Sequence, residues 1–128
     1  MTYAYDMGTN GKGHLTSIAN ARSATNVTGF DALGHVLAST QATAGQTYNF
    51  DFAYNLAGAL TSETYPSGRV LTMSRDGANR VTKVAGAFNG RQTQYATVLS
   101  YTPQGTPTFY SYGNGLVRAQ SYNSRLQF

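Results

Sequence analysis

The sequence predicts an all-β fold made of consecutive antiparallel hairpins. Three observations predict it. Short stretches alternate apolar or β-branched residues with polar ones, which is the period of a strand. Fourteen glycines and only three prolines indicate many tight turns. One pattern recurs along the chain: an aromatic residue, Asp or Asn, two linker residues, Gly, one further residue and an aliphatic. No stretch has a convincing helical period.

The alternation places strands along the whole chain. The expected ranges are 1–5, 15–19, 25–30, 36–41, 47–54, 60–65, 70–74, 81–85, 92–101, 108–112, 116–122 and 125–128. In the range 47–54, every second residue is aromatic: Tyr48, Phe50, Phe52 and Tyr54. A period of two places these rings on one face of a sheet. This strand is therefore expected to be central rather than at an edge.

Turn residues separate these strands. Asp6 to Gly13 predicts an enlarged turn, since an Asp carboxylate accepts a backbone N–H two residues further on. Pro66 to Gly68 has the proline and glycine of a tight turn. The Asn89-Gly90 pair predicts a two-residue hairpin loop.

Composition bounds the class of protein. The 128 residues fit one domain, 1–128. Charged residues make up 11% of the chain, against about 25% in ordinary soluble domains, which favours a sheet-rich extracellular protein. The chain has no cysteine, so disulfides and thiolate metal sites are excluded. No apolar run approaches a membrane span, and residues 1–5 do not form a signal peptide. We expect a fragment of a longer protein whose targeting segment lies elsewhere, the alternative being a soluble intracellular chain.

The recurring pattern defines a repeat. Its closing residues follow one another in steps of 21, 24, 21, 26 and 19 residues. Such a period is typical of repeat architectures and fits one hairpin with its connection. The closing residues are Leu15, Val36, Leu60, Val81, Pro107 and Leu126.

These residues resemble the YD-repeat, or RHS-repeat, family over nearly the whole chain, in about six copies. The first copy is enlarged, and the copy at Tyr101 has Thr102 in place of Asp. Residues at the family's Tyr-Asp positions are Tyr5-Asp6, Phe30-Asp31, Tyr54-Asn55, Arg75-Asp76 and Tyr122-Asn123. Those at its Gly-Arg-Leu positions are Gly13-His14-Leu15, Gly34-His35-Val36, Gly58-Ala59-Leu60, Asn79-Arg80-Val81 and Arg125-Leu126.

The resemblance implies a structural role. In that family, long arrays coil a β-sheet into a hollow shell around a toxin or other C-terminal domain, as in bacterial polymorphic toxins, or present a cell-surface module. It therefore implies a non-enzymatic scaffold in a secreted or cell-surface protein. About six repeats cannot close a shell, so we expect a curved, twisted open sheet, or alternatively a small β-sandwich. Its partners would be the rest of a longer chain or a second copy paired through the sheet edges.

A second hypothesis is recognition of glycans or acidic polymers. Exposed rings stack on sugars, and cations attract acidic groups. The candidate ligand-binding residues are Tyr48, Tyr95, Arg69, Arg75, Arg80 and Lys83. The net charge of +4 comes from scattered residues, so no nucleic-acid site is expected.

A third hypothesis is a hydrolase that uses Asp31, His35 or Asp76, and it depends only on the presence of polar residues. The carboxylates are explained by turns, and nothing in their spacing sets up a catalytic pair. A metal pair at His14 and His35 would need a third ligand, so exposed histidines beside turns are the favoured interpretation. We expect no catalytic residue, metal or cofactor.

Overall fold

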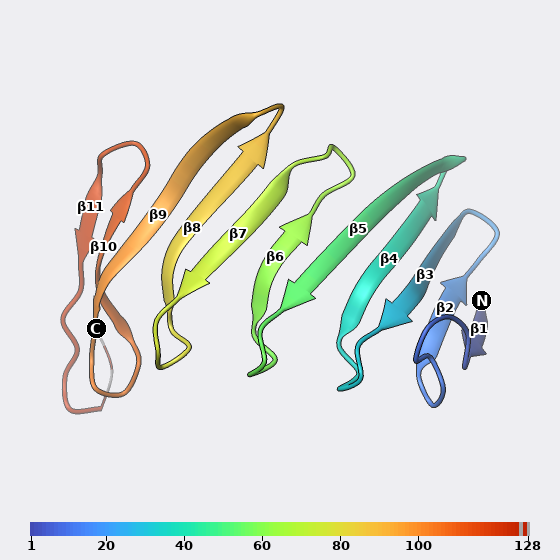
Figure 1. The fold of residues 1–128 in the computed structure, drawn as a ribbon, viewed down its shortest axis with the longest axis horizontal. Helices are drawn as coiled ribbons and strands as arrows, with labels where there is room; N and C mark the ends of the chain where they lie inside the picture. The colour runs from blue at the N-terminus through green and yellow to red at the C-terminus, as the bar shows by residue number, and fades with distance from the viewer. Residues whose placement is uncertain (126, 128) are drawn as a thin grey trace. The chain divides into compact units, whose positions relative to one another are not determined.

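The computed structural model describes residues 1–125 and 127. The backbone divides into two compact units, Met1–Val70 and Leu71–Phe128 (Figure 1). Within the described residues, all regular structure is β-strand and no helix is present, so the all-β class is confirmed. No helix in this described part is therefore long and apolar enough to cross a membrane. A single domain over residues 1–128 stays a prediction.

The first unit contains six strands in one antiparallel sheet, each paired with its neighbour in the chain (Figure 1). Every second strand starts at an aliphatic residue that closes a predicted repeat, which confirms the repeat boundaries in this unit. The strands are β1 (Thr2–Tyr5), β2 (Leu15–Ala19), β3 (Ser23–Phe30), β4 (Val36–Thr43), β5 (Gln46–Tyr54) and β6 (Leu60–Thr64).

In the second unit, too, each strand pairs with its neighbour in the chain. Its strands are β7 (Val70–Arg75), whose first residue belongs to the first unit, β8 (Val81–Phe88), β9 (Arg91–Tyr101), β10 (Pro107–Tyr112) and β11 (Val117–Ala119). Again β8 and β10 start at predicted closing residues.

The end of the second unit differs from expectation. The predicted strand 116–122 is limited to β11, although the backbone N–H of Gln120 still donates to the Thr108 carbonyl of β10 at 2.7 Å, in the register of the β10–β11 pair. Arg125 lies in a turn rather than a strand. The predicted repeat position Leu126 lies outside the described residues.

Each unit is a single layer of strands, so little side-chain surface is buried. Among the described side chains, Phe30 is the one large apolar residue in the buried class, with 5% of its surface exposed. A β-sandwich would instead bury the inner faces of two sheets. Within each unit the described strands form the open sheet that the sequence predicts, not the small sandwich.

Strand β5 has the predicted alternation and the predicted central place. It pairs with β4 on one side and β6 on the other. Phe50, Phe52 and Tyr54 are half-buried, while the alternate residues Asp51 and Ala53 are exposed. Because the sheet has one layer, the rings cover their own face and keep part of their surface in water.

Candidate functional site at the repeat turns

A five-residue turn recurs at the ends of the strands. In each copy, the first residue donates its backbone N–H to the carbonyl of the fifth, and the fourth donates to the carbonyl of the first. All these N···O distances lie between 2.7 and 3.1 Å. The turns that make both bonds are 31–35, 55–59, 65–69, 76–80, 102–106 and 112–116.

The fourth residue of each turn explains the recurring glycine. Its φ is positive, for example 87° at Gly34 and 87° at Gly105, which is the left-handed region that side chains disfavour. Asn79 occupies this position in the 76–80 turn with φ 64°, and Asn is the residue that best tolerates this region after Gly.

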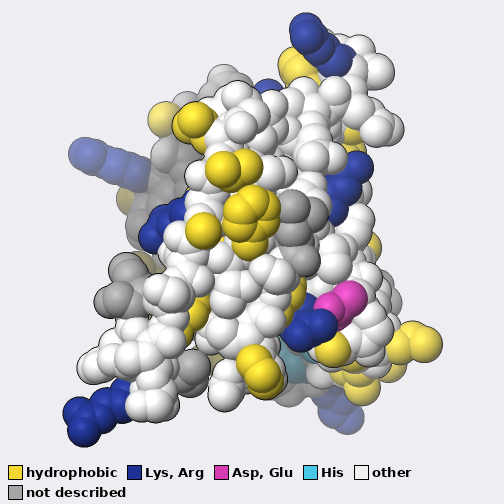
Figure 2. All heavy atoms as spheres, turned by 90° about the vertical axis from the view of Figure 1, so that its left-hand side faces the viewer, with side chains coloured by type: hydrophobic (Ala, Val, Ile, Leu, Met, Phe, Trp, Pro, Cys, Tyr) yellow, Lys and Arg dark blue, Asp and Glu magenta, His cyan; other side chains and the backbone are white. Residues whose placement is uncertain are grey.

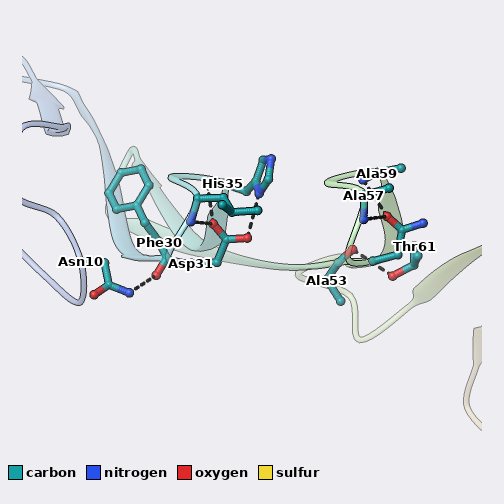
Figure 3. Close-up of polar contacts among 10 residues, drawn as sticks. Asn10, Phe30, Asp31, His35, Ala53, Ala57, Ala59 and Thr61 are labelled. Atoms are coloured by element: carbon teal, nitrogen blue, oxygen red, sulfur yellow. Dashed lines mark hydrogen bonds and ion pairs between the residues drawn. The ribbon is translucent and has the colours of Figure 1, made fainter.

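The first residue of the turn explains the recurring Asp or Asn. Oδ1 of Asp31 accepts the backbone N–H groups of Leu33 and His35 at 2.8 and 2.9 Å. Asn55 makes the same two bonds at 3.0 Å each, as Figure 3 shows for the two turns. One side-chain oxygen thus satisfies two backbone donors that the hairpin leaves unpaired. Asp76 and Asn123 repeat the arrangement, and Thr102 retains one of the two bonds.

The first turn is enlarged, as predicted. It keeps the bond from the first residue to the last, since the Asp6 N–H donates to the His14 carbonyl at 3.1 Å. The other bonds differ, because Oδ1 of Asp6 accepts the N–H of Gly13 at 2.6 Å and His14 donates its N–H to the Gly11 carbonyl at 3.0 Å. The inserted loop folds toward β3. Thr9 accepts the backbone N–H of Phe30 at 2.9 Å, and Asn10 donates its side-chain amide to the Phe30 carbonyl at 3.0 Å (Figure 3).

In two turns the fifth residue is tied to the first through the second carboxylate oxygen. Nδ1 of His35 lies 2.8 Å from Oδ2 of Asp31. In the second unit, Nε and Nη2 of Arg80 lie 2.8 and 2.7 Å from Oδ2 of Asp76. The hydrogen bond from each partner is the main cause that lowers the pKa of Asp31 and of Asp76 below the ordinary value for Asp.

In three turns the residue at the fifth position, His14, His35 or Arg80, also lies on the aromatic ring that precedes a later repeat turn. His14 stacks on Phe30 with centroids 4.4 Å apart and an interplanar angle of 20°. His35 stacks on Tyr54 at 4.8 Å and 23°. The guanidinium of Arg80 lies 4.8 Å from the Tyr101 ring centroid, a cation–π distance. We call these three contacts the inter-repeat pairs.

The prediction of exposed histidines beside the turns is therefore wrong for both histidines. His14 and His35 are half-buried because each imidazole packs against a ring on the neighbouring strand. Each also lies close to a turn glycine. A Cβ on Gly34 would be 3.0 Å from Cε1 of His14, and one on Gly58 would be 3.0 Å from Cε1 of His35. Spacing alone gave no signal for this contact.

The burial of the receiving rings affects their hydroxyls. Burial is the main cause that raises the pKa of Tyr54 and of Tyr101 above the ordinary value for Tyr. The Tyr101 hydroxyl donates to the Val81 carbonyl, so the ring is fixed at its far end as well. These tyrosines are therefore held in place as structural groups.

The predicted ligand-binding residues lie in different surroundings. Tyr48 has 43% of its surface exposed. The Tyr95 ring covers Gly86 of β8, where an added Cβ would be 2.6 Å from the hydroxyl oxygen. Arg75 donates from Nη1 to the Asn79 carbonyl at 2.8 Å, and Arg80 is engaged as described above.

The remaining two predicted cations, Arg69 in the first unit and Lys83 in the second, are exposed. On the face seen in Figure 2, Lys and Arg side chains stand apart from one another rather than forming one patch. Ligand binding by these six residues stays a prediction.

The candidate catalytic residues lie at turns. Asp31 and His35 are adjacent, but Asp31 holds two backbone N–H groups and His35 is stacked on Tyr54. Asp76 belongs to the second unit, where it binds Arg80. Within the described residues, no three His, Cys, Asp or Glu side chains gather as metal ligands would. The contacts of these Asp, His and Arg side chains fix each turn and join it to the next repeat.

The turns, their recurring first and fourth residues and the strands that follow them form one repeated unit. Residues 30–70 and 54–92 match the family model described as RHS Repeat. Residues 30–92 carry RHS repeats. The RHS-repeat resemblance inferred from the Tyr-Asp and Gly-Arg-Leu positions is thereby confirmed.

Solved structures share the fold of this RHS-repeat chain. A crystal structure of TcdB2-TccC3 superposes with a TM-score of 0.84 at 16% identity, over 94% of this chain and 7% of that one. TcdB2-TccC3 without its hypervariable C-terminal region gives 0.83 at 16%, over 95% and 7%. The Photorhabdus luminescens Tc holotoxin pore gives 0.81 at 15%, over 95% and 7%. The chain thus spans about 7% of the length of these solved chains. No curated protein matches it in sequence.

Proposed function

We propose that this chain is a non-enzymatic structural segment of a longer secreted or cell-surface protein, whose RHS repeats form a sheet that encloses a cargo domain. The observation that carries the proposal is the inter-repeat pair. A turn residue of one repeat packs on a ring of the following repeat, which suits a continuous wall of repeats. The similarity in fold to short portions of much longer toxin chains also supports it.

The state of the polar groups supports a structural role as well. The Asp and Asn side chains of the turns bind backbone N–H groups, and no buried side-chain nitrogen or oxygen in the described part of the chain lacks a hydrogen-bond partner. Catalytic groups usually remain available to a substrate and have neighbours that prepare them for reaction. Here the polar groups are used within the fold.

The test uses the full reading frame that contains this chain. Limited proteolysis would follow cleavage of any segment beyond the repeats, in the native protein and in a Phe30→Ala variant. An enclosed cargo is cleaved slowly in the native protein and much faster in the variant, because Phe30 is buried within the sheet. Tyr48→Ala, which removes a ring that is 43% exposed, is the matched control. Equal cleavage of the cargo in native protein and Phe30→Ala would contradict enclosure.

A second candidate function is glycan binding by the aromatic face of the first unit. Tyr48 is exposed on this face, and its cross-strand neighbour Gln41 is exposed beside it, so a ring and an amide are both open to a sugar. A glycan array would compare native protein with Tyr48→Ala and Tyr95→Ala. Binding that is lost in Tyr48→Ala and retained in Tyr95→Ala supports this function, because Tyr95 covers Gly86 instead. The absence of binding by the native chain would rule it out.

A further inference from the structure

The inter-repeat pairs follow one rule of position. The fifth residue of a turn begins or precedes a strand, and the ring it covers ends the neighbouring strand in the sheet. In this way His14 before β2 covers Phe30 at the end of β3, and His35 before β4 covers Tyr54 at the end of β5. Each ring directly precedes the first residue of its own turn. We therefore expect a ring at this position to be covered by the fifth residue of the preceding repeat's turn.

Tyr5 occupies this ring position and has an exposed ring. It ends β1, directly precedes Asp6, and has 57% of its surface exposed, whereas Phe30 at the equivalent position has 5%. The glycine of its turn is open too. A Cβ on Gly13 would meet nothing within 4 Å, although its φ of 82° is that of the other turn glycines.

The edge of β1 beside Tyr5 is also open. β1 is the first strand in the sheet order, and within the described residues it pairs with β2 alone. All four of its residues are exposed, and they include no charged residue or proline that would prevent pairing. The enlarged first turn leaves this edge uncovered, since its inserted loop folds toward β3.

We propose that the free edge of β1 accepts a further hairpin of the same repeat type, which places an imidazole on Tyr5 and against Gly13. The proposal rests on the structural role in a longer array and names the group that joins the next repeat. The partner strand runs antiparallel to β1, as every described neighbour does. We choose an added repeat hairpin as the occupant because the same sheet already contains two such pairs, His14 on Phe30 and His35 on Tyr54.

The turn glycines favour an imidazole over a guanidinium. Gly34 and Gly58 each have a histidine carbon within 3.0 Å of the position of an added Cβ. Gly105, in the turn that follows the ring paired with Arg80, has nothing within 4 Å. An imidazole therefore uses both the ring and the glycine, whereas a guanidinium uses the ring alone. The first unit offers an open ring together with an open glycine.

The test adds one hairpin to the intact chain. A copy of residues 30–49 is fused directly before Met1. Its copied histidine then precedes Tyr5 by 19 residues, the same separation as between His35 and Tyr54. Four proteins make a double-mutant cycle: the fusion, the fusion with His35→Ala in the copied segment, the fusion with Tyr5→Leu, and the fusion with both changes.

The expected result is a coupling between the copied histidine and Tyr5. Aromatic pairs contribute beyond their buried area, so the coupling should change the unfolding equilibrium constant about threefold to tenfold. Hydrogen exchange should also show the amides of residues 2–5 protected in the fusion. Tyr3→Leu is the matched control, since Tyr3 is 55% exposed on the same strand and should show no such coupling.

Three outcomes would overturn the proposal. Protected β1 amides with no coupling would mean that the edge accepts a hairpin without an imidazole on Tyr5, and this leaves the enclosing role intact. Unprotected β1 amides in the fusion would reject the hairpin itself. Protection that rises with concentration in the unfused chain would assign the edge to a second copy. The proteolysis of the full-length protein tests the enclosing role separately.

Discussion

The Asp31 turn of the first unit and the Asp76 turn of the second use the same frame with different fifth residues. In both, Oδ1 of the Asp holds two backbone N–H groups and Oδ2 holds the side chain of the fifth residue. That residue is His35 in one and Arg80 in the other, and each lies 4.8 Å from a tyrosine ring centroid.

The difference shows which property each position requires. The first position does not require a charge, because Asn55 makes the same backbone bonds as Asp31. Turns that begin with Tyr65 and Tyr112 also form both backbone bonds, so a side-chain oxygen adds to the turn without being necessary for it. The fifth position accepts an imidazole or a guanidinium, which share a flat shape and N–H donors but differ in size and in how they titrate. The turn and the inter-repeat pair are therefore separable, and substitutions can remove one while the other remains.

The largest expected effect comes from the receiving rings. Phe30→Ala should lower the free energy of unfolding by about 3 kcal/mol, since it removes a buried ring and leaves a cavity. Tyr101→Ala should cost roughly half as much, because Tyr101 is half-buried. Denaturant unfolding of both variants gives the comparison. Equal losses of unfolding free energy would contradict this difference, because a ring covered by an imidazole and one covered by a guanidinium would then contribute equally to stability.

An intermediate effect is expected at the turn glycines. Gly34 and Gly105 share a φ of 87°, so replacement by Ala costs each about 1 kcal/mol in backbone strain. Gly34→Ala should cost about 1 kcal/mol more, because the new Cβ would lie 3.0 Å from the His14 ring. Thermal or urea unfolding measures both. If the two variants lose the same stability, the imidazole moves away freely and the contact with glycine carries no energy.

The smallest effect is expected from the charges, and it depends on pH. The folded pKa of Asp31 and of Asp76 is below the ordinary 3.8, so the unfolded chain binds more protons as the solution becomes acidic. This stabilisation is present in full above that value and is lost as pH falls through the folded pKa. Asp31→Asn and Asp76→Asn retain Oδ1 and should flatten the loss of stability between about pH 5 and pH 2. Urea midpoints across this range are the measurement, and unchanged slopes in both variants would contradict it.

Much of the fold could be predicted from the sequence because the turns are local. An Asp or Asn followed three residues later by Gly dictates both the bonds and the positive φ within five residues. For this reason the closing residues Leu15, Val36, Leu60, Val81 and Pro107 mark the first residues of β2, β4, β6, β8 and β10. Even the Thr102 copy, which departs from the pattern, keeps both backbone bonds.

The inter-repeat pairs could not be predicted because they depend on the register between strands. His35 and Tyr54 are 19 residues apart, and they meet only after β4 and β5 pair. Tyr54 also lies beside a register shift, which belongs to the pairing of β5 with β6. A similar shift precedes Phe30 in the pairing of β3 with β4. A period-two pattern does not show where an extra residue enters a strand. The contact of Tyr95 with Gly86 escaped prediction for the same reason, since a shift in register lies between Val84 and Ala85.

Pairing of each strand with its neighbour in the chain has a consequence for how each unit comes apart. No described strand depends on a partner from a distant part of the sequence, so cooperativity passes from one hairpin to the next, as in a one-dimensional chain of coupled units. Such a unit frays from its outermost strand inward. It also gains stability by increments as hairpins are added, so evolution can lengthen the array by duplicating a hairpin without redesigning a core.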